Sequence, residues 1–236
     1  MSYCDVIPSH AAIEEGMLRG KAAIVIDTLR ATSVMVTAME HGAASIRCVL
    51  EPAEALAMKE ADPDLILCGE RRALKIPGFD LSNSPLEFTR EAVLGRRLVM
   101  TTTNGTRTLL KSEEAHGIHI GCLRNARAAA EQGLAEGRDL MLINAGTGGF
   151  FTLDDFITAG AMISRIKGRV ELSDRALAAL LLYEAHPGIH SALEQSYHYR
   201  RLKNLGREAD LEHCLAQDVS SVVPEYRDGT VTRPLD

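Results

Sequence analysis

The sequence predicts an α/β/α fold with three layers, in which helices cover both faces of a mainly parallel sheet. Short apolar runs alternate with helical patterns along most of the chain, which is typical of parallel strands joined by crossover helices. Two segments, about residues 20–94 and 95–168, share the order strand, polar turn, helix, strand, helix, strand. Generic βαβ units can look alike through patterning alone, but here the polar turns also fall in register. We therefore expect one domain over residues 1–236, with an internal duplication and a helical C-terminal part over residues 173–236.

Composition and charge argue against several classes of protein. The 236 residues are 46% hydrophobic and 25% charged, which is ordinary for a globular protein. The net charge is −6 and no basic block is present, so we expect no nucleic-acid partner. No run of about eighteen apolar residues exists, so we expect no membrane partner. The five scattered cysteines lack metal-binding spacing, and the first residues lack a signal-peptide pattern, so we expect a cytoplasmic protein.

The expected strands are short runs of aliphatic and β-branched residues, too short for helices. In chain order they cover residues 3–7, 24–26, 44–50, 65–68, 98–100, 118–123 and 140–143. Pro8 ends the first of them. The strand over residues 24–26 gives way directly to a helical pattern, so it opens the first repeated unit.

The expected helices follow from capping residues and prolines. A helix over residues 34–41 would be capped by Thr32 or Ser33, and Pro52 suits the first turn of the next, over residues 52–61. Residues 84–87 have the pattern of a capping box before a helix that ends at Gly95. The remaining helices of the two units are expected after the caps Asn104, Asn125 and Thr152.

The sequence pattern changes at Ser173, where a helical C-terminal part begins. Amphipathic helical patterns cover residues 173–185, 189–204 and 207–217. Their apolar faces suit either packing against the sheet or the interface of a homo-oligomer. We expect surface or core roles for His186, His190 and His198, because their spacing is not that of metal ligands. Residues 222–224 and the tail are expected to form an edge strand.

Polar side chains follow the strand over residues 24–26 directly. The stretch from Asp27 to Ser33 sets an acid, an arginine and two hydroxyls at the carboxyl end of a strand, where open α/β sheets bind ligands. A helix N-terminus beside Arg30 suits phosphate. A carboxylate such as Asp27 repels phosphate unless a cation lies between them, and Mg²⁺ is the usual such cation. A structural ion pair between Asp27 and Arg30 explains the stretch about equally well.

Three further loops carry related chemistry. Glu70 and Arg71 follow the strand over residues 65–68, before a long irregular stretch of the kind that is often functional. Residues 101–107 supply hydroxyls, an amide and backbone N–H groups that suit phosphate. The glycine-rich loop over residues 144–151 leads to Asp154 and Asp155, for which helix capping is the competing explanation.

These motifs resemble those of the 2-phosphosulfolactate phosphatases, the ComB family. The family's Asp-x-Leu-Arg-Ala-Thr-Ser motif matches residues 27–33, and its Thr-Thr-Asn-Gly-Thr motif matches residues 102–106. Its Gly-Glu-Arg…Lys-x-x-Gly-Phe-Asp…Asn-Ser-Pro motif matches residues 69–71, 75, 78–80 and 83–85. Its Ala-Gly-x-x-Gly…acid-Asp…Ala-Gly motif matches residues 145–149, 154–155 and 159–160. The resemblance covers roughly residues 3–225.

The resemblance implies a magnesium-dependent phosphoric monoester hydrolase that converts 2-phosphosulfolactate to 3-sulfolactate and phosphate. As a hypothesis, the catalytic residues are Asp27, Arg30 and Glu70, and the candidate Mg²⁺ ligands are Asp27, Glu70 and Asp155. The candidate substrate-binding residues are Thr32, Ser33, Arg71, Lys75, Thr103, Asn104, Gly105 and Thr106. The sequence fits direct attack by water and a phospho-enzyme at Asp27 equally.

Three other functions fit parts of the sequence. Arg72-Ala73, Ser82 and Asn144 depart from the family's usual residues, which leaves room for a phosphatase of another small phospho-acid. A non-catalytic protein that binds anionic metabolites would have the same pocket. The loop over residues 146–149 suggests a nucleotide-binding oxidoreductase, but it lacks the spacing of a dinucleotide-binding loop.

Overall fold

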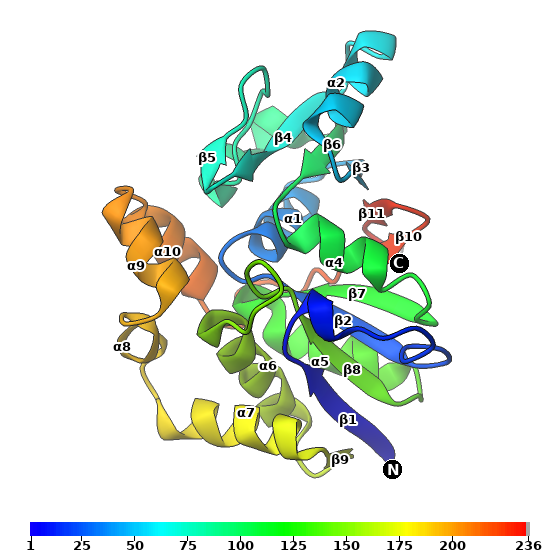
Figure 1. Ribbon diagram of the computed structural model, residues 1–236, viewed down its shortest axis with the longest axis vertical. Helices are drawn as coiled ribbons and strands as arrows, with labels where there is room; N and C mark the ends of the chain where they lie inside the picture. The colour runs from blue at the N-terminus through cyan, green and yellow to red at the C-terminus, as the bar shows by residue number, and fades with distance from the viewer. Residues whose placement is uncertain (235–236) are drawn as a thin grey trace.

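The computed structural model describes residues 1–234, through which runs one eleven-stranded sheet (Figure 1). The strands are β1 (Ser2–Ile7), β2 (Ala22–Ile26), β3 (Ser45–Cys48), β4 (Ile66–Arg71), β5 (Leu74–Lys75), β6 (Arg97–Thr101), β7 (Gly117–Gly121), β8 (Leu140–Asn144), β9 (Val170–Leu172), β10 (Glu225–Arg227) and β11 (Thr230–Thr232). Their order across the sheet is β5-β4-β6-β3-β11-β10-β7-β2-β8-β1-β9.

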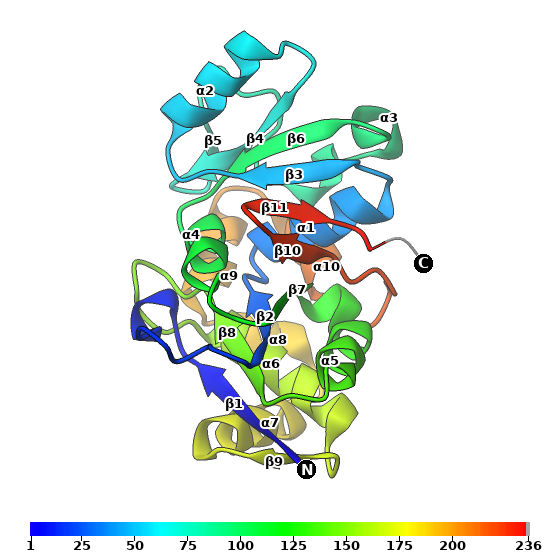
Figure 2. The same ribbon diagram turned by 90° about the vertical axis from the view of Figure 1, so that its right-hand side faces the viewer.

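Two blocks of parallel strands make up most of the sheet. One block is β4-β6-β3 and the other is β7-β2-β8-β1-β9. The antiparallel hairpin of β10 and β11 joins them, with β11 paired to β3 and β10 paired to β7 (Figure 2). The expectation of an edge strand in the tail is therefore wrong, because the hairpin supplies partners to two strand edges that would otherwise be open.

The two units exchange their first strands. β2, β3 and β4 belong to the first unit, and β6, β7 and β8 to the second. β6 lies between β4 and β3, whereas β2 lies between β7 and β8. Each unit therefore pairs its first strand with the second and third strands of the other. This exchange brings the loops after β2, β4, β6 and β8 to one side of the molecule.

Helices cover both faces of the sheet, which confirms the predicted three-layer α/β/α fold. They are α1 (Ala31–Glu40), α2 (Pro52–Ala61), α3 (Arg90–Val93), α4 (Gly105–Lys111), α5 (Ala126–Ala135), α6 (Leu153–Ile166), α7 (Asp174–Ala185), α8 (Ile189–Leu193), α9 (Tyr197–Asn204) and α10 (Glu208–Leu215). Short 3₁₀ helices are η1 (His10–Ala12), η2 (Pro85–Glu87) and η3 (Leu123–Asn125). None of the helices in residues 1–234 has the length and apolar character needed to cross a bilayer.

The alternation of side chains along β2 shows how the layers form. Ile24 and Ile26 face the apolar cluster that contains α5, α6 and α7. Ala23 and Val25 face the opposite cluster, which contains α1 and α4. Because both faces are buried, the strand is apolar at every position, as parallel strands usually are.

The expected helix over residues 84–95 is divided in the structure. Glu87 accepts hydrogen bonds from the N–H and Oγ of Ser82, at 2.5 and 2.6 Å, so it does not close a capping box with Ser84. The chain forms η2 and then α3, whose cap is Thr89. The cap expected for the helix after β2 is also wrong, since α1 begins at Ala31 without a side-chain cap.

Candidate active site

A cavity of about 380 Å³ lies where the loops after β2, β4, β6 and β8 meet α9. Its lining residues are Asp27, Leu29, Arg30, Glu70, Arg71, Arg72, Ala73, Asn83, Thr102, Thr103, Asn104, Thr147, Tyr197, His198, Arg201 and Leu202. Six of the predicted site residues are among them, namely Asp27, Arg30, Glu70, Arg71, Thr103 and Asn104. The carboxyl ends of the strands therefore carry the site, as expected for an open α/β sheet.

Asp27 follows β2 and is 8% exposed. Its Oδ1 accepts a hydrogen bond from the N–H of Ala31 at 3.3 Å, and its own N–H donates to Oγ1 of Thr32 at 3.0 Å. Burial raises the pKa of Asp27 to about 6, helped by the charges of Asp154 and Glu70 and opposed by His198 and by the N–H of Ala31. A positive charge beside Asp27 would therefore stabilise its ionised form.

Gly105 makes room for the carboxylate of Asp27. A Cβ at this position would lie 2.8 Å from Oδ2 of Asp27 and 2.7 Å from Cβ of Ala31. The residue is not part of the cavity lining, so its contribution is space rather than a contact with substrate.

Glu70 links the loop after β4 to the loop after β6. Its Oε1 accepts from the N–H and Oγ1 of Thr103, at 2.8 and 2.7 Å, and its Oε2 accepts from the N–H of Ala73 at 2.7 Å. The side chain thus orders two walls of the cavity while it faces the interior.

Arg30 is buried and pairs with a residue far away in the sequence. Its Nη1 donates to Oδ2 of Asp210 on α10 at 2.5 Å, and its Nη2 donates to the carbonyl of Ala73 at 3.1 Å. The alternative of a structural pair between Asp27 and Arg30 is therefore wrong, because Asp210 is the salt-bridge partner of the guanidinium.

Arg71 folds back against the sheet. Its guanidinium donates to the carbonyls of Glu70 and Leu50, at 2.8 and 2.6 Å, and to Oγ1 of Thr101 at 2.9 Å. Three protein acceptors hold it in the wall of the cavity, so it contributes fixed positive charge.

Asp155 lies beside the cavity rather than in its lining. Its Oδ1 accepts from the N–H of Thr28, and its Oδ2 accepts from the N–H of Gly146 and from Oγ1 of Thr152, all at 3.0 Å. These bonds join the start of α6 to the ends of β2 and β8. Burial raises the pKa of Asp155, with Asp154 and Asp27 adding to the effect. Asp155 is outside the cavity lining and its carboxylate joins three segments of the chain, so metal binding at Asp155 stays a prediction that this geometry does not favour.

Four other predicted binding residues are not part of the cavity lining. The Oγ of Ser33 donates to the carbonyl of Thr28 at 2.8 Å, and Thr32 accepts from Asp27 as described above. Thr106 exchanges hydrogen bonds with Thr102. The Nζ of Lys75 reaches the carbonyl of Asp80 at 3.4 Å on an exposed strand. The three hydroxyls shape the loops, because short polar side chains readily bond to nearby backbone.

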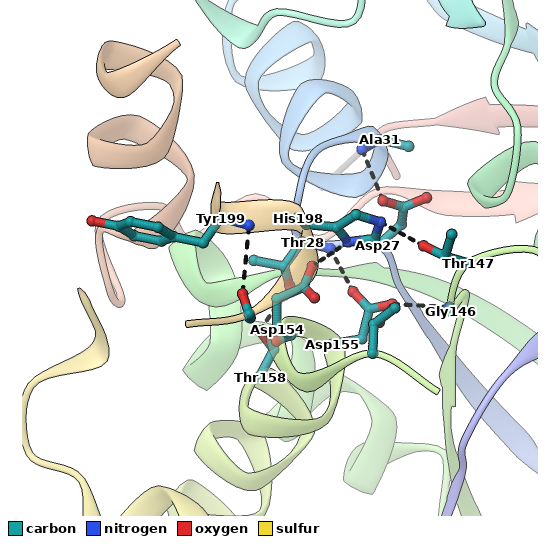
Figure 3. A network of polar contacts seen from close by, with 12 residues as sticks. Asp27, Thr28, Ala31, Gly146, Thr147, Asp154, Asp155, Thr158, His198 and Tyr199 are labelled. Carbon is teal, nitrogen blue, oxygen red and sulfur yellow. Dashed lines mark hydrogen bonds and ion pairs between the residues drawn. The ribbon is translucent and has the colours of Figure 1, made fainter. Parts of the chain in front are cut away.

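His198 joins the site from α9, contrary to the expectation of a surface or core role (Figure 3). Its Nδ1 lies 3.0 Å from Oδ2 of Asp154, and its Nε2 lies 2.5 Å from Oγ1 of Thr147. Burial alone would lower the pKa of His198, but the carboxylates of Asp154, Asp155 and Asp27 raise it to about 9. These carboxylates therefore favour the positively charged form of the imidazole.

The C-terminal helices supply several residues that sequence reasoning missed. Arg201 on α9 donates to the carbonyl of Arg72 and to the hydroxyl of Tyr197, both at 2.7 Å, at the edge of the cavity. One signal was available for α9: Ser196 caps it and divides the amphipathic pattern over residues 189–204. The cap places the start of the helix at Tyr197, directly before His198. No pattern in the sequence indicates that Asp210 pairs with Arg30.

Comparisons with known proteins agree with this geometry. A family model described as 2-phosphosulpholactate phosphatase matches residues 7–229. Proteins named "Probable 2-phosphosulfolactate phosphatase" from Clostridium beijerinckii, Clostridium acetobutylicum and Clostridium novyi are 42%, 43% and 44% identical to this chain. These alignments cover 97%, 96% and 97% of this chain and 98%, 98% and 99% of the relatives. The chain belongs to the 2-phosphosulpholactate phosphatase family.

Proposed function

We propose that this protein hydrolyses 2-phosphosulfolactate to 3-sulfolactate and inorganic phosphate, with Mg²⁺ bound at Asp27 and Glu70. Family membership supports a phosphoric monoester hydrolase, and the relatives' names supply the substrate. The observation that carries the proposal is the composition of the cavity lining, which contains two carboxylates together with several arginines.

The charges of the cavity complement those of the substrate. 2-Phosphosulfolactate carries a phosphate ester, a carboxylate and a sulfonate, and such a molecule needs several cations around it. The cationic lining residues are Arg30, Arg71, Arg72, His198 and Arg201. The protein as a whole carries a net charge of −6, so this positive charge is a local feature of the site.

The two carboxylates of the cavity are donors that suit Mg²⁺. Although no group of three or more His, Cys, Asp or Glu side chains within residues 1–234 is arranged to hold a metal, Mg²⁺ does not require one. Mg²⁺ commonly takes one or two carboxylates and completes its shell with water and substrate oxygens. Oδ2 of Asp27 accepts no hydrogen bond from the described residues, and Oε2 of Glu70 accepts one, so both have lone pairs to offer. When bound, the metal would neutralise charge that develops on the phosphoryl oxygens.

The residues of the chain position the phosphoryl group. Arg30 is fixed by Asp210, and its remaining N–H groups would bind phosphoryl oxygens in the planar geometry that guanidinium provides. Oδ1 of Asn104 accepts from the N–H of Gly148 at 3.1 Å, which leaves its amide nitrogen to donate to substrate. These donors would stabilise charge in the transition state, the largest contribution to phosphoryl transfer.

The test is phosphate release from 2-phosphosulfolactate, with Mg²⁺ and with EDTA, beside a panel of small phospho-acids. We expect release that requires Mg²⁺ and favours the sulfonate. Phosphate release that persists in EDTA would reject the requirement for Mg²⁺ but would still support the phosphatase function. Release from another phospho-acid alone would reject the substrate, and no release from any compound by folded protein would reject the function.

Asp27→Asn is the sharpest variant for this site, because it keeps the size of the side chain and removes its charge. We expect kcat/KM to fall by about 100-fold or more. Asp64→Asn is the matched control, since Asp64 is exposed and outside the cavity lining. Near wild-type activity of Asp27→Asn with unchanged dependence on Mg²⁺ would remove Asp27 from the mechanism.

A further inference from the structure

Three elements converge on the imidazole of His198. Asp154 comes from the first turn of α6, Thr147 from the loop after β8, and Asp27 from the loop after β2 (Figure 3). His198 lines the cavity, whereas Asp154 lies behind it and is 1% exposed. The imidazole thus stands between a buried carboxylate and the space in which the substrate would bind.

The hydrogen-bond partners of His198 indicate which of its ring nitrogens carry protons. A carboxylate only accepts, so the contact of Nδ1 with Asp154 fixes a proton on Nδ1. Among residues 1–234, His198 is the only donor to the side-chain oxygens of Asp154, and a buried carboxylate requires a positive partner. The second proton of the imidazolium is then on Nε2, which meets Thr147 at the cavity.

We propose that His198, held by Asp154, donates a proton from Nε2 to the leaving oxygen of the substrate. The proposal rests on the phosphatase function proposed above and adds the acid that the reaction needs. The leaving oxygen belongs to an alkyl hydroxyl, which departs poorly as an alkoxide. The ester P–O bond breaks while a bond forms from phosphorus to the oxygen of the attacking water. The leaving oxygen takes the proton of Nε2, and the proton released by water restores the imidazolium.

Thr147 keeps the donor in position before substrate binds. Its Oγ1 lies 2.5 Å from Nε2, and in the imidazolium form that we propose it accepts from Nε2, so the N–H has a partner at the surface of the cavity. A substrate oxygen that enters beside Thr147 would take over this hydrogen bond. Asp154 is a positioning residue in this scheme, because it acts through His198.

The first test compares leaving groups. Proton donation matters for the alkyl ester of 2-phosphosulfolactate, whereas 4-nitrophenolate leaves without a proton. We expect His198→Gln to lower kcat on 2-phosphosulfolactate by about 100-fold or more with little change in KM. With 4-nitrophenyl phosphate, the same variant should keep its rate within about threefold of wild type. His186→Gln, an exposed substitution at the end of α7, is the matched control and should not change either rate.

The second test uses pH and does not depend on the aryl ester. The titratable groups around His198 are Asp154 and Asp155 of α6, Asp27 after β2, and the phenol of Tyr197. Arg201 of its own helix lines the same cavity. Because the acid form is active, kcat/KM of the wild type should fall at alkaline pH, where the imidazolium loses its proton. Asp154→Asn removes the nearest negative charge, so this fall should begin at lower pH. The His198→Gln variant should show no such fall in kcat/KM.

The outcomes separate the inference from the function on which it rests. An inactive wild type would reject the phosphatase. If the wild type is active and His198→Gln hydrolyses 2-phosphosulfolactate within about threefold of the wild-type rate, His198 is not the proton donor. The proposed phosphatase function would then still stand. Equal losses on both esters, or an alkaline limb that Asp154→Asn does not move, would assign His198 a purely structural role. Circular dichroism of each variant shows that a loss of rate is not a loss of fold.

Discussion

The side chains of Arg30 and Asp210 meet beneath the cavity although 180 residues separate them in the sequence. They are 3% and 2% exposed, and buried charges persist only when they are paired and hydrogen-bonded. Oγ of Ser84 donates to the second oxygen of Asp210 at 2.6 Å and completes the arrangement. The carboxylate therefore fixes the guanidinium in the orientation that we propose for binding phosphate.

Asp210→Asn should be costly because it leaves the guanidinium of Arg30 buried without a negative partner. We expect the free energy of unfolding to fall by about 3 kcal/mol, as measured by urea denaturation. Glu208→Gln is the matched control, since it changes an exposed acid of the same helix. Equal stability of the two variants would mean that the pair contributes nothing to the fold.

Single residues show which parts of the site were predictable. Asp27 and Asn104 follow strands, and Glu70 lies at the carboxyl end of β4. The apolar runs of these strands are evident, so the convergence of the three side chains on one cavity could be predicted. The hydroxyls of Thr32 and Ser33 stand in the same motif, yet they bond to nearby atoms of the chain. A motif shows which side chains are near a site, but the choice between substrate and backbone depends on local geometry. Magnesium binding stays a prediction.

At the scale of elements, the hairpin of β10 and β11 has a local signal in the sequence. Asp228-Gly229 joins the two strands with φ of 49° and 77°, as type I′ turns require. An Asp-Gly pair between alternating residues is a strong local indication of a hairpin. The location of the hairpin in the middle of the sheet depends on β3 and β7, and no local pattern reports such distant partners.

Gly229→Ala should weaken this hairpin, because a residue with a Cβ is strained at a φ of 77°. We expect a loss of about 1 kcal/mol in the free energy of unfolding, measured by urea denaturation. Asp228→Asn keeps the turn type and should leave the stability unchanged. A Gly229→Ala protein as stable as wild type would show that the turn conformation does not limit the fold.

At the scale of the whole molecule, the alternation of strands and helices was enough to predict the three layers. The exchange of β2 and β6 between the two units was not predictable, because pairing between parallel strands leaves no trace in either strand alone. The C-terminal helices also do more than cover the sheet, since α9 and α10 bring His198 and Asp210 to the site. The internal duplication and a homo-oligomer stay predictions.

The exchange predicts that the two units cannot fold separately. A cut in the exposed turn at Leu94 and Gly95 would separate β2 from β7 and β8, and β6 from β3 and β4. We expect neither fragment alone to show a cooperative urea transition by circular dichroism, whereas an equal mixture should regain one. A cooperative transition in residues 1–94 alone would show that the first unit is independently stable.

The central hairpin also has a consequence for biosynthesis. A ribosome makes β10 and β11 after every other strand of the sheet, yet these two strands fill its middle. Until residues 225–232 emerge, the nascent chain therefore holds two separate blocks with the edges of β3 and β7 unpaired. Open edges of this kind attract other chains. The synthesis of residues 225–232 is thus the step that closes both open edges.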